Sequence, residues 1–230
     1  MFCSHHFHLY MPPFFSPGSI PESTQTHTVV LADDSILARQ SLAIALPMIS
    51  PSCSVVGEAS DGDETVELCM RLKPAVLITD LRLPKRNGIG LITHFRSVLP
   101  SMQVVIYTGC ESAELLGVTH DAHPAGVVHA EDGVLGLRKA FEAAAAGERY
   151  VSKAVMDRIR RQSGERTALT TTEISVLSMV TEGQKTAEIA SRLGMSERTV
   201  GAHRENIHKK LGTHDHAALL KWAMRNGMME

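Results

Sequence analysis

Short apolar runs alternate with amphipathic stretches between residues 28 and 152, and this alternation constrains the fold more than any other feature of the chain. Strands that alternate with helices predict a parallel sheet covered by helices on both faces. Ligands of such sheets bind at the carboxyl ends of the strands. The runs predict strands at 28–33, 54–59, 75–80, 103–108 and 125–129. The stretches predict helices at 35–48, 62–72, 88–98, 111–120 and 134–146.

Acidic residues stand where two of these runs end. Asp33 and Asp34 close the first run, and Asp80 closes the third. If the two runs are neighbouring parallel strands, three carboxylates meet at one edge of the sheet. Two like charges about 4 Å apart repel by about 4 kcal/mol at an effective dielectric constant of about 20. A fold tolerates such a cluster when a hard cation such as Mg²⁺ binds the oxygens, and a cation beside a reactive carboxylate suits phosphoryl transfer onto Asp80.

The charge of the chain differs between its two halves. Residues 28–152 hold ten Lys and Arg against fifteen Asp and Glu, whereas residues 153–230 hold thirteen against nine. This split fits an acidic, metal-binding half and a half that tolerates polyanions. Residues 1–27 carry almost no charge and no basic start before an apolar core, so we expect a flexible tail without a secretory signal. No apolar run is long enough to span a membrane, and the four scattered cysteines favour a reducing, cytoplasmic setting.

The last third of the chain has the pattern of a small helical domain. Residues 148–166 are polar and basic, and they predict a linker with a short helix over 153–161. Four short helices follow, of which the first opens with a capping box at Thr170 and Glu173 and the third begins at Ser196. We expect the fourth to run from about 214 to 225.

In their order and spacing these motifs resemble the NarL/FixJ-type response regulators, which join a receiver domain to a LuxR-type helix-turn-helix domain. The resemblance implies a flavodoxin-like, doubly wound receiver of five parallel strands in the order 2-1-3-4-5, joined to a four-helix domain. It places the receiver at 28–147, the linker at 148–166 and the helix-turn-helix domain at 167–230. The motifs that carry it are Asp33-Asp34, Ile78–Gly88, Tyr107–Gly109, Gly147–Ser152, Leu169-Thr170, Thr186–Ala190, Ser196–Val200, His203-Arg204 and Lys209–Gly212.

The resemblance also implies a role for each residue at the acidic edge. Asp80 would accept a phosphoryl group from a partner histidine kinase. Asp33, Asp34 and Asp80 would hold Mg²⁺ together with the backbone carbonyl of Arg82. Thr108 would hydrogen-bond the phosphoryl oxygen and move with it. A phosphoaspartate carries nearly two negative charges where the carboxylate carried one, and a partner surface would sense the resulting rearrangement. The family regulates transcription, and we do not expect an enzyme.

Two switch positions depart from the family pattern. Ala130 stands where receivers carry a lysine at the end of the fifth strand, and Val127 replaces the usual aromatic switch residue. A charge-assisted hydrogen bond contributes about 1.5–3 kcal/mol, so the missing lysine removes much of the signal without removing phosphorylation. The loop after Asp80 offers cations that could replace it, namely Arg82, Lys85 and Arg86.

Three functions therefore stay open. In the first, Asp80 is phosphorylated and drives dimerisation on DNA. In the second, a degenerate receiver controls DNA binding without phosphorylation. In the third, the chain is a phosphate sink or protein-interaction module, and its helical domain only dimerises.

The resemblance places DNA recognition on the helix at 197–211, whose first turns would enter the major groove of double-stranded DNA. Glu205 is able to accept from a cytosine amine, and Ala202 is able to contact a thymine methyl. The expected DNA contacts are Lys185, Thr186, Ser196, Arg198, Thr199, Gly201, Ala202, Arg204, Glu205 and Lys209. One domain covers only a half-site, so we expect a homodimer joined on the last helix by Leu219, Leu220, Trp222 and Ala223.

Overall fold

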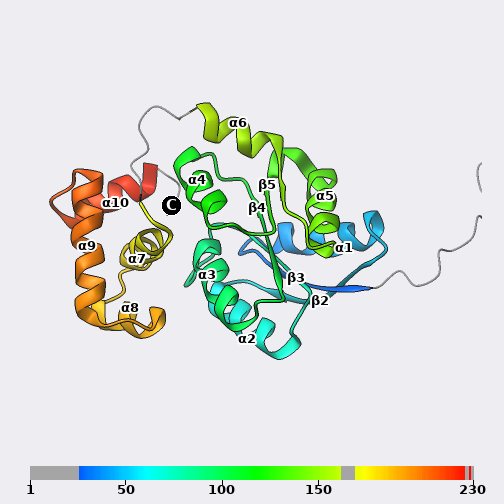
Figure 1. The fold of residues 1–230 in the computed structure, drawn as a ribbon, viewed down its shortest axis with the longest axis horizontal. Coiled ribbons are helices and arrows are strands. Elements are labelled where there is room, and N and C mark those ends of the chain that lie inside the picture. The colour runs from blue at the N-terminus through cyan, green and yellow to red at the C-terminus, as the bar shows by residue number, and fades with distance from the viewer. Residues whose placement is uncertain (1–25, 162–168, 226–227, 229–230) are drawn as a thin grey trace, which may run out of the picture.

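The apolar runs of the N-terminal half form one parallel sheet in a computed structural model, which describes residues 26–161, 169–225 and 228. Its hydrogen-bonded strands follow the order β2-β1-β3-β4-β5-β6. Figure 1 shows the sheet with helices packed around it. This order puts β1 beside β3 and confirms the doubly wound, flavodoxin-like topology. The first five strands are β1 (His27–Ala32), β2 (Cys53–Ala59), β3 (Val76–Thr79), β4 (Gln103–Thr108) and β5 (Gly126–His129).

Helices cover both faces of this sheet, because the side chains of each strand alternate between two apolar layers. In β5, Val127 packs into the layer of Phe95 and Leu116, whereas Val128 packs into the opposite layer with Phe141. None of the described helices is both long and apolar enough to cross a bilayer. One layer holds α1 (Ile36–Ile49) and α5 (Gly133–Ala145), and the other holds α2 (Gly62–Leu72), α3 (Gly88–Val98) and α4 (Ala113–Asp121).

A sixth strand extends the sheet, so the expectation of five strands is corrected. The strand β6 (Tyr150–Val151) pairs in parallel with β5, and the Ser152 amide adds a 2.9 Å hydrogen bond to the Val127 carbonyl oxygen. Two residues are too few to show an alternation of apolar and polar side chains, which is why the sequence did not reveal this strand. The expected helix at 153–161 is confirmed as α6 (Lys153–Arg161), and it packs against α4 and β5. Residues 150–161 of the predicted linker therefore lie on the N-terminal half.

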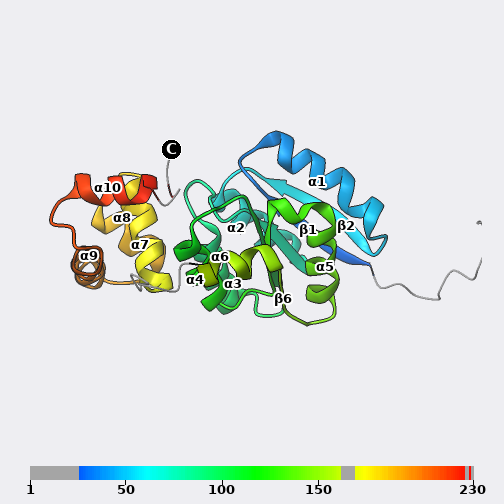
Figure 2. The ribbon, with the colours of Figure 1, turned by 90° about the horizontal axis from the view of Figure 1, so that it is seen from above.

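The C-terminal half is the expected set of four helices, and Figure 2 shows it beside the sheet-containing half. Thr170 forms the predicted capping box, in which its hydroxyl accepts from the Glu173 amide and the Glu173 carboxylate accepts from the Thr170 amide. Ser196 caps the third helix, and Gly194 and Gly212 adopt the left-handed conformation that ends the second and third. The helices are α7 (Thr171–Thr181), α8 (Thr186–Leu193), α9 (Glu197–Leu211) and α10 (His216–Arg225).

The capping box at Thr170 predicts a modest loss of stability on mutation. Replacing Thr170 by alanine removes the hydroxyl that accepts from the Glu173 amide over 3.2 Å. We expect the free energy of unfolding of the C-terminal half to fall by about 1 kcal/mol. Urea unfolding followed by circular dichroism measures this change. Thr171→Ala, at the first helical residue, is the matched control, and equal losses in the two variants would contradict the assignment.

Candidate functional sites

Three carboxylates stand at the edge formed by the carboxyl ends of β1 and β3. Asp33 and Asp34 follow β1, and Asp80 follows β3. The Asp80 amide donates to the Ala32 carbonyl oxygen over 2.9 Å, which fixes the two strand ends side by side. Asp33 and Asp80 line one small hollow, while Asp34 and Asp80 line a larger cavity of about 350 Å³. Arg82, whose carbonyl was expected to add a ligand, lines the larger cavity too.

The carboxylates at this edge repel one another, and that of Asp33 is partly buried. Burial raises the pKa of the Asp33 carboxyl above its ordinary value of 3.8. The Ser35 amide offsets part of this rise by donating to Asp33 Oδ1 over 2.8 Å, whereas the charges of Asp80 and Asp34 raise the pKa further. A divalent cation with oxygen ligands would relieve this repulsion. The donor chemistry of the edge therefore fits Mg²⁺.

The three carboxylates nevertheless do not converge on one point. Within residues 26–161, 169–225 and 228, no group of three or more His, Cys, Asp or Glu side chains is placed to hold one metal ion. Local turns orient the side chains, because Asp33 Oδ1 accepts from the Ser35 amide and Asp80 Oδ1 accepts from the Leu81 amide over 2.7 Å. The expectation that Asp33, Asp34 and Asp80 surround one ion is thus not met in this conformation. Mg²⁺ often binds through only one or two carboxylates and keeps several waters, so the edge still suits it.

The switch positions lie where the sequence placed them. Thr108 is buried at the end of β4, opposite His129 of β5, and its hydroxyl accepts from the Cys110 amide over 3.3 Å. Val127 is fully buried in the apolar layer, so its side chain presents nothing at the surface of this edge. Ala130 is exposed at the start of the short 3₁₀ turn Ala130–Asp132. The edge thus carries a threonine without a lysine on the neighbouring strand end.

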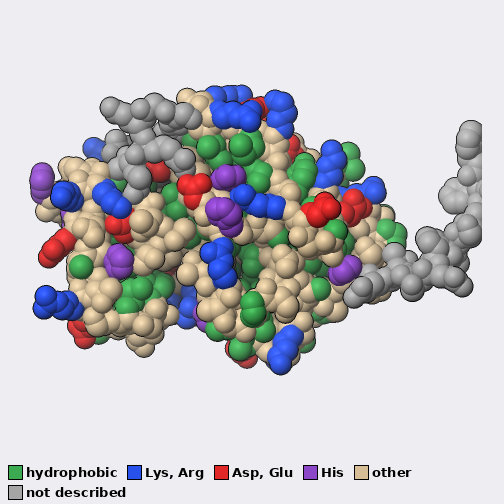
Figure 3. All heavy atoms as spheres, viewed as in Figure 1, with side chains coloured by type: hydrophobic (Ala, Val, Ile, Leu, Met, Phe, Trp, Pro, Cys, Tyr) green, Lys and Arg blue, Asp and Glu red, His purple; other side chains and the backbone are tan. Residues whose placement is uncertain are grey.

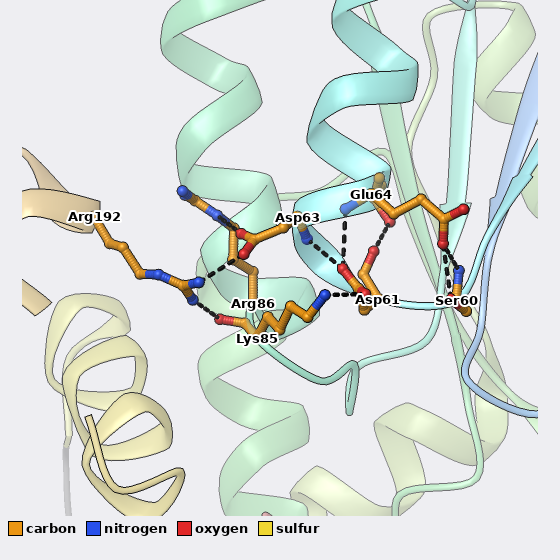
Figure 4. A network of polar contacts seen from close by, with 8 residues as sticks. Ser60, Asp61, Asp63, Glu64, Lys85, Arg86 and Arg192 are labelled. Carbon is orange, nitrogen blue, oxygen red and sulfur yellow. Dashed lines mark hydrogen bonds and ion pairs between the residues drawn. The ribbon is translucent and has the colours of Figure 1, made fainter. Parts of the chain in front are cut away.

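Two of the three cations proposed as substitutes for that lysine are bound elsewhere. Lys85 Nζ contacts Asp61 Oδ2 at 2.5 Å, and Arg86 Nε contacts Asp63 Oδ1 at 2.8 Å, as Figure 4 shows. Both carboxylates belong to the start of α2, which lies beside the loop after β3. The prediction that Lys85 or Arg86 serves Asp80 is therefore wrong for this conformation. Arg82 shares the larger cavity with Asp80.

The same loop holds the two halves of the protein together. Arg192 of α8 donates to Asp63 Oδ2 over 2.6 Å and to the Lys85 carbonyl oxygen over 2.9 Å (Figure 4). The larger cavity also lies between the halves, since its lining includes Asp80 from one half and Ile174 from the other. Sequence reasoning missed this contact, because an arginine on an amphipathic helix gives no sign of a partner 129 residues away.

Reversing the charge of Arg192 is expected to separate the halves. Arg192→Glu removes both hydrogen bonds and places a carboxylate beside Asp63, so attraction becomes repulsion. We expect a larger radius of gyration in small-angle X-ray scattering. Arg198→Glu, on an exposed residue of α9, is the control for the change in net charge. An unchanged radius in Arg192→Glu would show that other contacts hold the halves together.

The helix α9 presents most of the residues expected to contact DNA. Ser196, which caps the helix, accepts from the Thr199 amide over 3.1 Å, so its hydroxyl is already engaged. Arg204 is half-buried and donates to the Thr186 hydroxyl over 3.2 Å, which ties α9 to α8. Figure 3 shows Lys and Arg side chains along this outer edge, with acidic and histidine side chains among them. The exposed members of the set are Lys185, Ser196, Arg198, Thr199, Ala202, Glu205 and Lys209, and the half-buried members are Thr186, Gly201 and Arg204.

The residues expected to join two copies lie mainly inside the C-terminal half. Leu219, Trp222 and Ala223 are buried in its apolar core, and only Leu220 remains half-buried at the surface. A stripe of apolar residues at helical spacing shows that a face is buried but not what covers it. Here the domain's own helices, with Val200 and Ile207 of α9 in the same core, cover the face. The prediction of a contact between copies through Leu219, Trp222 and Ala223 is therefore corrected.

Comparison with known proteins matches both halves. Residues 29–129 match the model of the response regulator receiver domain, and residues 167–223 match that of the bacterial regulatory proteins of the luxR family. The transcriptional regulatory protein MctR of Rhizobium johnstonii is 30% identical over 205 residues, which cover 87% of this chain and 94% of the relative. The response regulator GacA of Pseudomonas viridiflava is 29% identical and covers 88% of this chain and 97% of its own length.

A solved structure shows the same architecture. RcsB from Salmonella enterica serovar Typhimurium, bound to the promoter rprA in the presence of the phosphomimetic BeF3-, superposes with a TM-score of 0.67. It is 27% identical, and the match covers 86% of this chain and 98% of RcsB. The paired domains, the acidic edge and the likeness over nearly full length agree. This chain belongs to the NarL/FixJ-type response regulators, the transcriptional regulators of two-component systems that join a receiver to a LuxR-type DNA-binding domain.

Proposed function

We propose that Asp80 accepts a phosphoryl group from a partner histidine kinase and thereby controls the binding of the C-terminal domain to DNA. The observation that supports this most is the position of Asp80, at the carboxyl end of β3, beside Asp33 and in a cavity shared with the DNA-binding half. In the transfer, an Asp80 carboxylate oxygen attacks phosphorus, an O–P bond forms, and the P–N bond to the kinase imidazole breaks. The added charge then appears at the boundary between the two halves.

Mg²⁺ is the proposed cofactor of this transfer. Asp33 and Asp80 line one hollow, and Asp34 and Arg82 line the larger cavity together with Asp80. The Asp34 carboxylate and the Arg82 carbonyl would be the further oxygen donors. When bound, the ion would neutralise the charge that develops on the transferring phosphoryl group. Thr108 supplies a hydroxyl at the end of the neighbouring strand β4. The side chains of Ala130 and Val127 supply no group that could hydrogen-bond a phosphoryl oxygen. Phosphorylation is therefore expected to produce a weaker switch than a lysine-containing receiver would.

DNA binding is proposed to use the exposed face of α9 as a homodimer on double-stranded DNA. Two solved neighbours describe RcsB bound to a promoter and two RcsB dimers bound to two parallel DNAs. One helix-turn-helix domain covers a half-site, so two copies would give a full site. We further propose domains at 28–147 and 167–230, joined by residues 148–166, of which 150–161 pack on the N-terminal domain. We also propose a cytoplasmic location. Residues 1–25 and 162–168, which include most of the expected tail and part of the linker, lie outside the described residues.

Intact-mass spectrometry tests the phosphorylation step. Incubation with phosphoramidate and Mg²⁺ is expected to add one phosphoryl group to the wild-type chain and none to Asp80→Asn, and a metal chelator is expected to prevent the addition. Asp121→Asn, which changes an exposed carboxylate at the end of α4, is the matched control and should still gain the group. A wild-type mass that stays constant would favour the degenerate receiver, a reading that Ala130 and Val127 already support.

A further inference from the structure

One arginine of α6 joins two loops at the carboxyl edge of the sheet. Arg158 donates to Glu111 through Nε at 2.8 Å and through Nη2 at 3.0 Å. It donates to Glu131 through Nη1 and Nη2, both at 2.8 Å. Its side chain is only 15% exposed, and these paired, charge-assisted bonds fix it in one orientation. We call Arg158, Glu111 and Glu131 the Arg158 clamp.

The two loops of the clamp are those that carry the switch positions. Glu111 lies three residues after Thr108, and Glu131 directly follows Ala130. The strand ends before them are paired, with Thr108 opposite His129. The buried ring of His129 lies against both carboxylates, with Nε2 3.4 Å from Glu111 Oε1 and Nδ1 3.7 Å from Glu131 Oε2. The clamp thus spans the place where a lysine would otherwise connect these loops.

A short path of contacts leads from Thr108 to the clamp. The Thr108 hydroxyl accepts from the Cys110 amide, and Glu111 is the next residue. The charged phosphoryl oxygens of a phosphorylated Asp80 would accept a strong hydrogen bond from the Thr108 hydroxyl, so Thr108 would turn toward them. Such a turn of Thr108 would pull on the Cys110 amide and so on the adjacent Glu111. Because the Arg158 bonds are directional, a shift of Glu111 weakens one arm of the clamp.

On its other side the clamp fixes the start of the connection to the DNA-binding half. Arg161 ends α6, and the described chain resumes at Leu169. The eight residue-to-residue steps from Arg161 to Leu169 span at most about 28 Å, so a docked α6 limits how far the C-terminal half can move. Release of α6 would add its nine residues to this tether. The clamp and the Arg192 contact therefore both restrain movement of the C-terminal half away from the N-terminal half. The clamp acts through the connection at α6, and Arg192 acts through the direct contact of α8.

We propose that Arg158 is a positioning residue that replaces the missing lysine as the link between the two switch loops, and that its clamp releases α6 when Asp80 is phosphorylated. This inference rests on the phosphorylation proposed above. Both carboxylates are largely exposed, so the clamp adds little to global stability. Its effect lies in the local opening of α6, which is where the test is placed.

Hydrogen exchange of the full chain, with and without phosphoramidate and Mg²⁺, measures this opening. In the wild type, phosphorylation is expected to raise exchange in α6 about fivefold or more. Arg158→Met is expected to show that faster exchange before phosphorylation and no further rise afterwards. Arg158→Lys keeps the positive charge but loses the guanidinium group that donates to both carboxylates. Its exchange in α6 should lie between those of the wild type and Arg158→Met. Arg138→Met, which breaks the exposed pair of Arg138 and Glu142 on α5, is the matched control and should behave as wild type.

The outcomes separate the two proposals. If the mass shows phosphorylation but wild-type α6 exchange is unchanged, the coupling is overturned and the phosphorylation stands. If Arg158→Met exchanges like the wild type without phosphoramidate, the clamp does not hold α6 and the inference fails. If no phosphoryl group is added, the phosphorylation proposal and the coupling both fail, and the unphosphorylated variants still show whether Arg158 holds α6.

Discussion

Replacing Arg204 and Lys209 together by alanine is expected to weaken binding to DNA by about a hundredfold near 0.1 M salt. Each phosphate contact contributes about 0.9 to the slope of log affinity against log salt, so two lost contacts per domain lower the slope by about two. Lys209 is exposed on α9, and Arg204 is half-buried beside Thr186. Fluorescence anisotropy with a labelled, mixed-sequence duplex across a salt series measures both quantities.

A charge-matched control makes this result specific. Lys153→Ala with Lys221→Ala removes two exposed lysines that lie on α6 and α10, away from α9. That variant is expected to keep a slope near the wild-type value. Equal losses in the two double variants would mean that net charge, and not the face of α9, sets the affinity. Circular dichroism of the Arg204 variant excludes unfolding, since the residue also ties α9 to α8.

The strands and helices of the receiver were accessible from sequence because each buries one side of a repeating pattern. The run over 103–108 matches β4 residue for residue, and 62–72 and 88–98 match α2 and α3. The caps of the C-terminal half could be predicted for the same reason, since Thr170, Ser196 and the backbone amides that donate to their hydroxyls lie within one turn. Features of this kind depend on residues that are close in sequence, so the sequence alone is enough to predict them.

The features that sequence reasoning missed depend on neighbours in space. Lys85 and Arg86 follow Asp80 closely, yet their partners come from the start of α2, more than twenty residues away. Arg192 and Arg158 bind carboxylates still farther along the chain. Nothing in the local pattern distinguishes these arginines from solvated ones. The apolar stripe that contains Leu219 and Trp222 correctly predicted a buried face of the last helix, but not what covers it. A core and an interface between copies both give the same helical spacing of apolar residues.

The departures from the family pattern were visible at once, and they lead to the last prediction. Ala130→Lys is expected to enlarge the effect of phosphorylation on DNA affinity by roughly ten- to a hundredfold, which corresponds to one charge-assisted hydrogen bond of about 1.5–3 kcal/mol. Ala130 is exposed where β5 ends, next to the strand end that carries Thr108, so a longer side chain has room to extend. The affinity ratio with and without phosphoramidate measures the gain.

The control for this variant is Ala130→Met, which has similar length without the charge. Methionine is expected to leave the affinity ratio near the wild-type value, because it cannot donate to a phosphoryl oxygen. A lysine here also lies beside Glu131 of the Arg158 clamp, and an ion pair with that carboxylate would loosen the clamp before phosphorylation. That outcome would appear as tighter DNA binding without phosphoramidate and a smaller ratio, so the direction of the change shows whether the lysine serves Asp80 or Glu131.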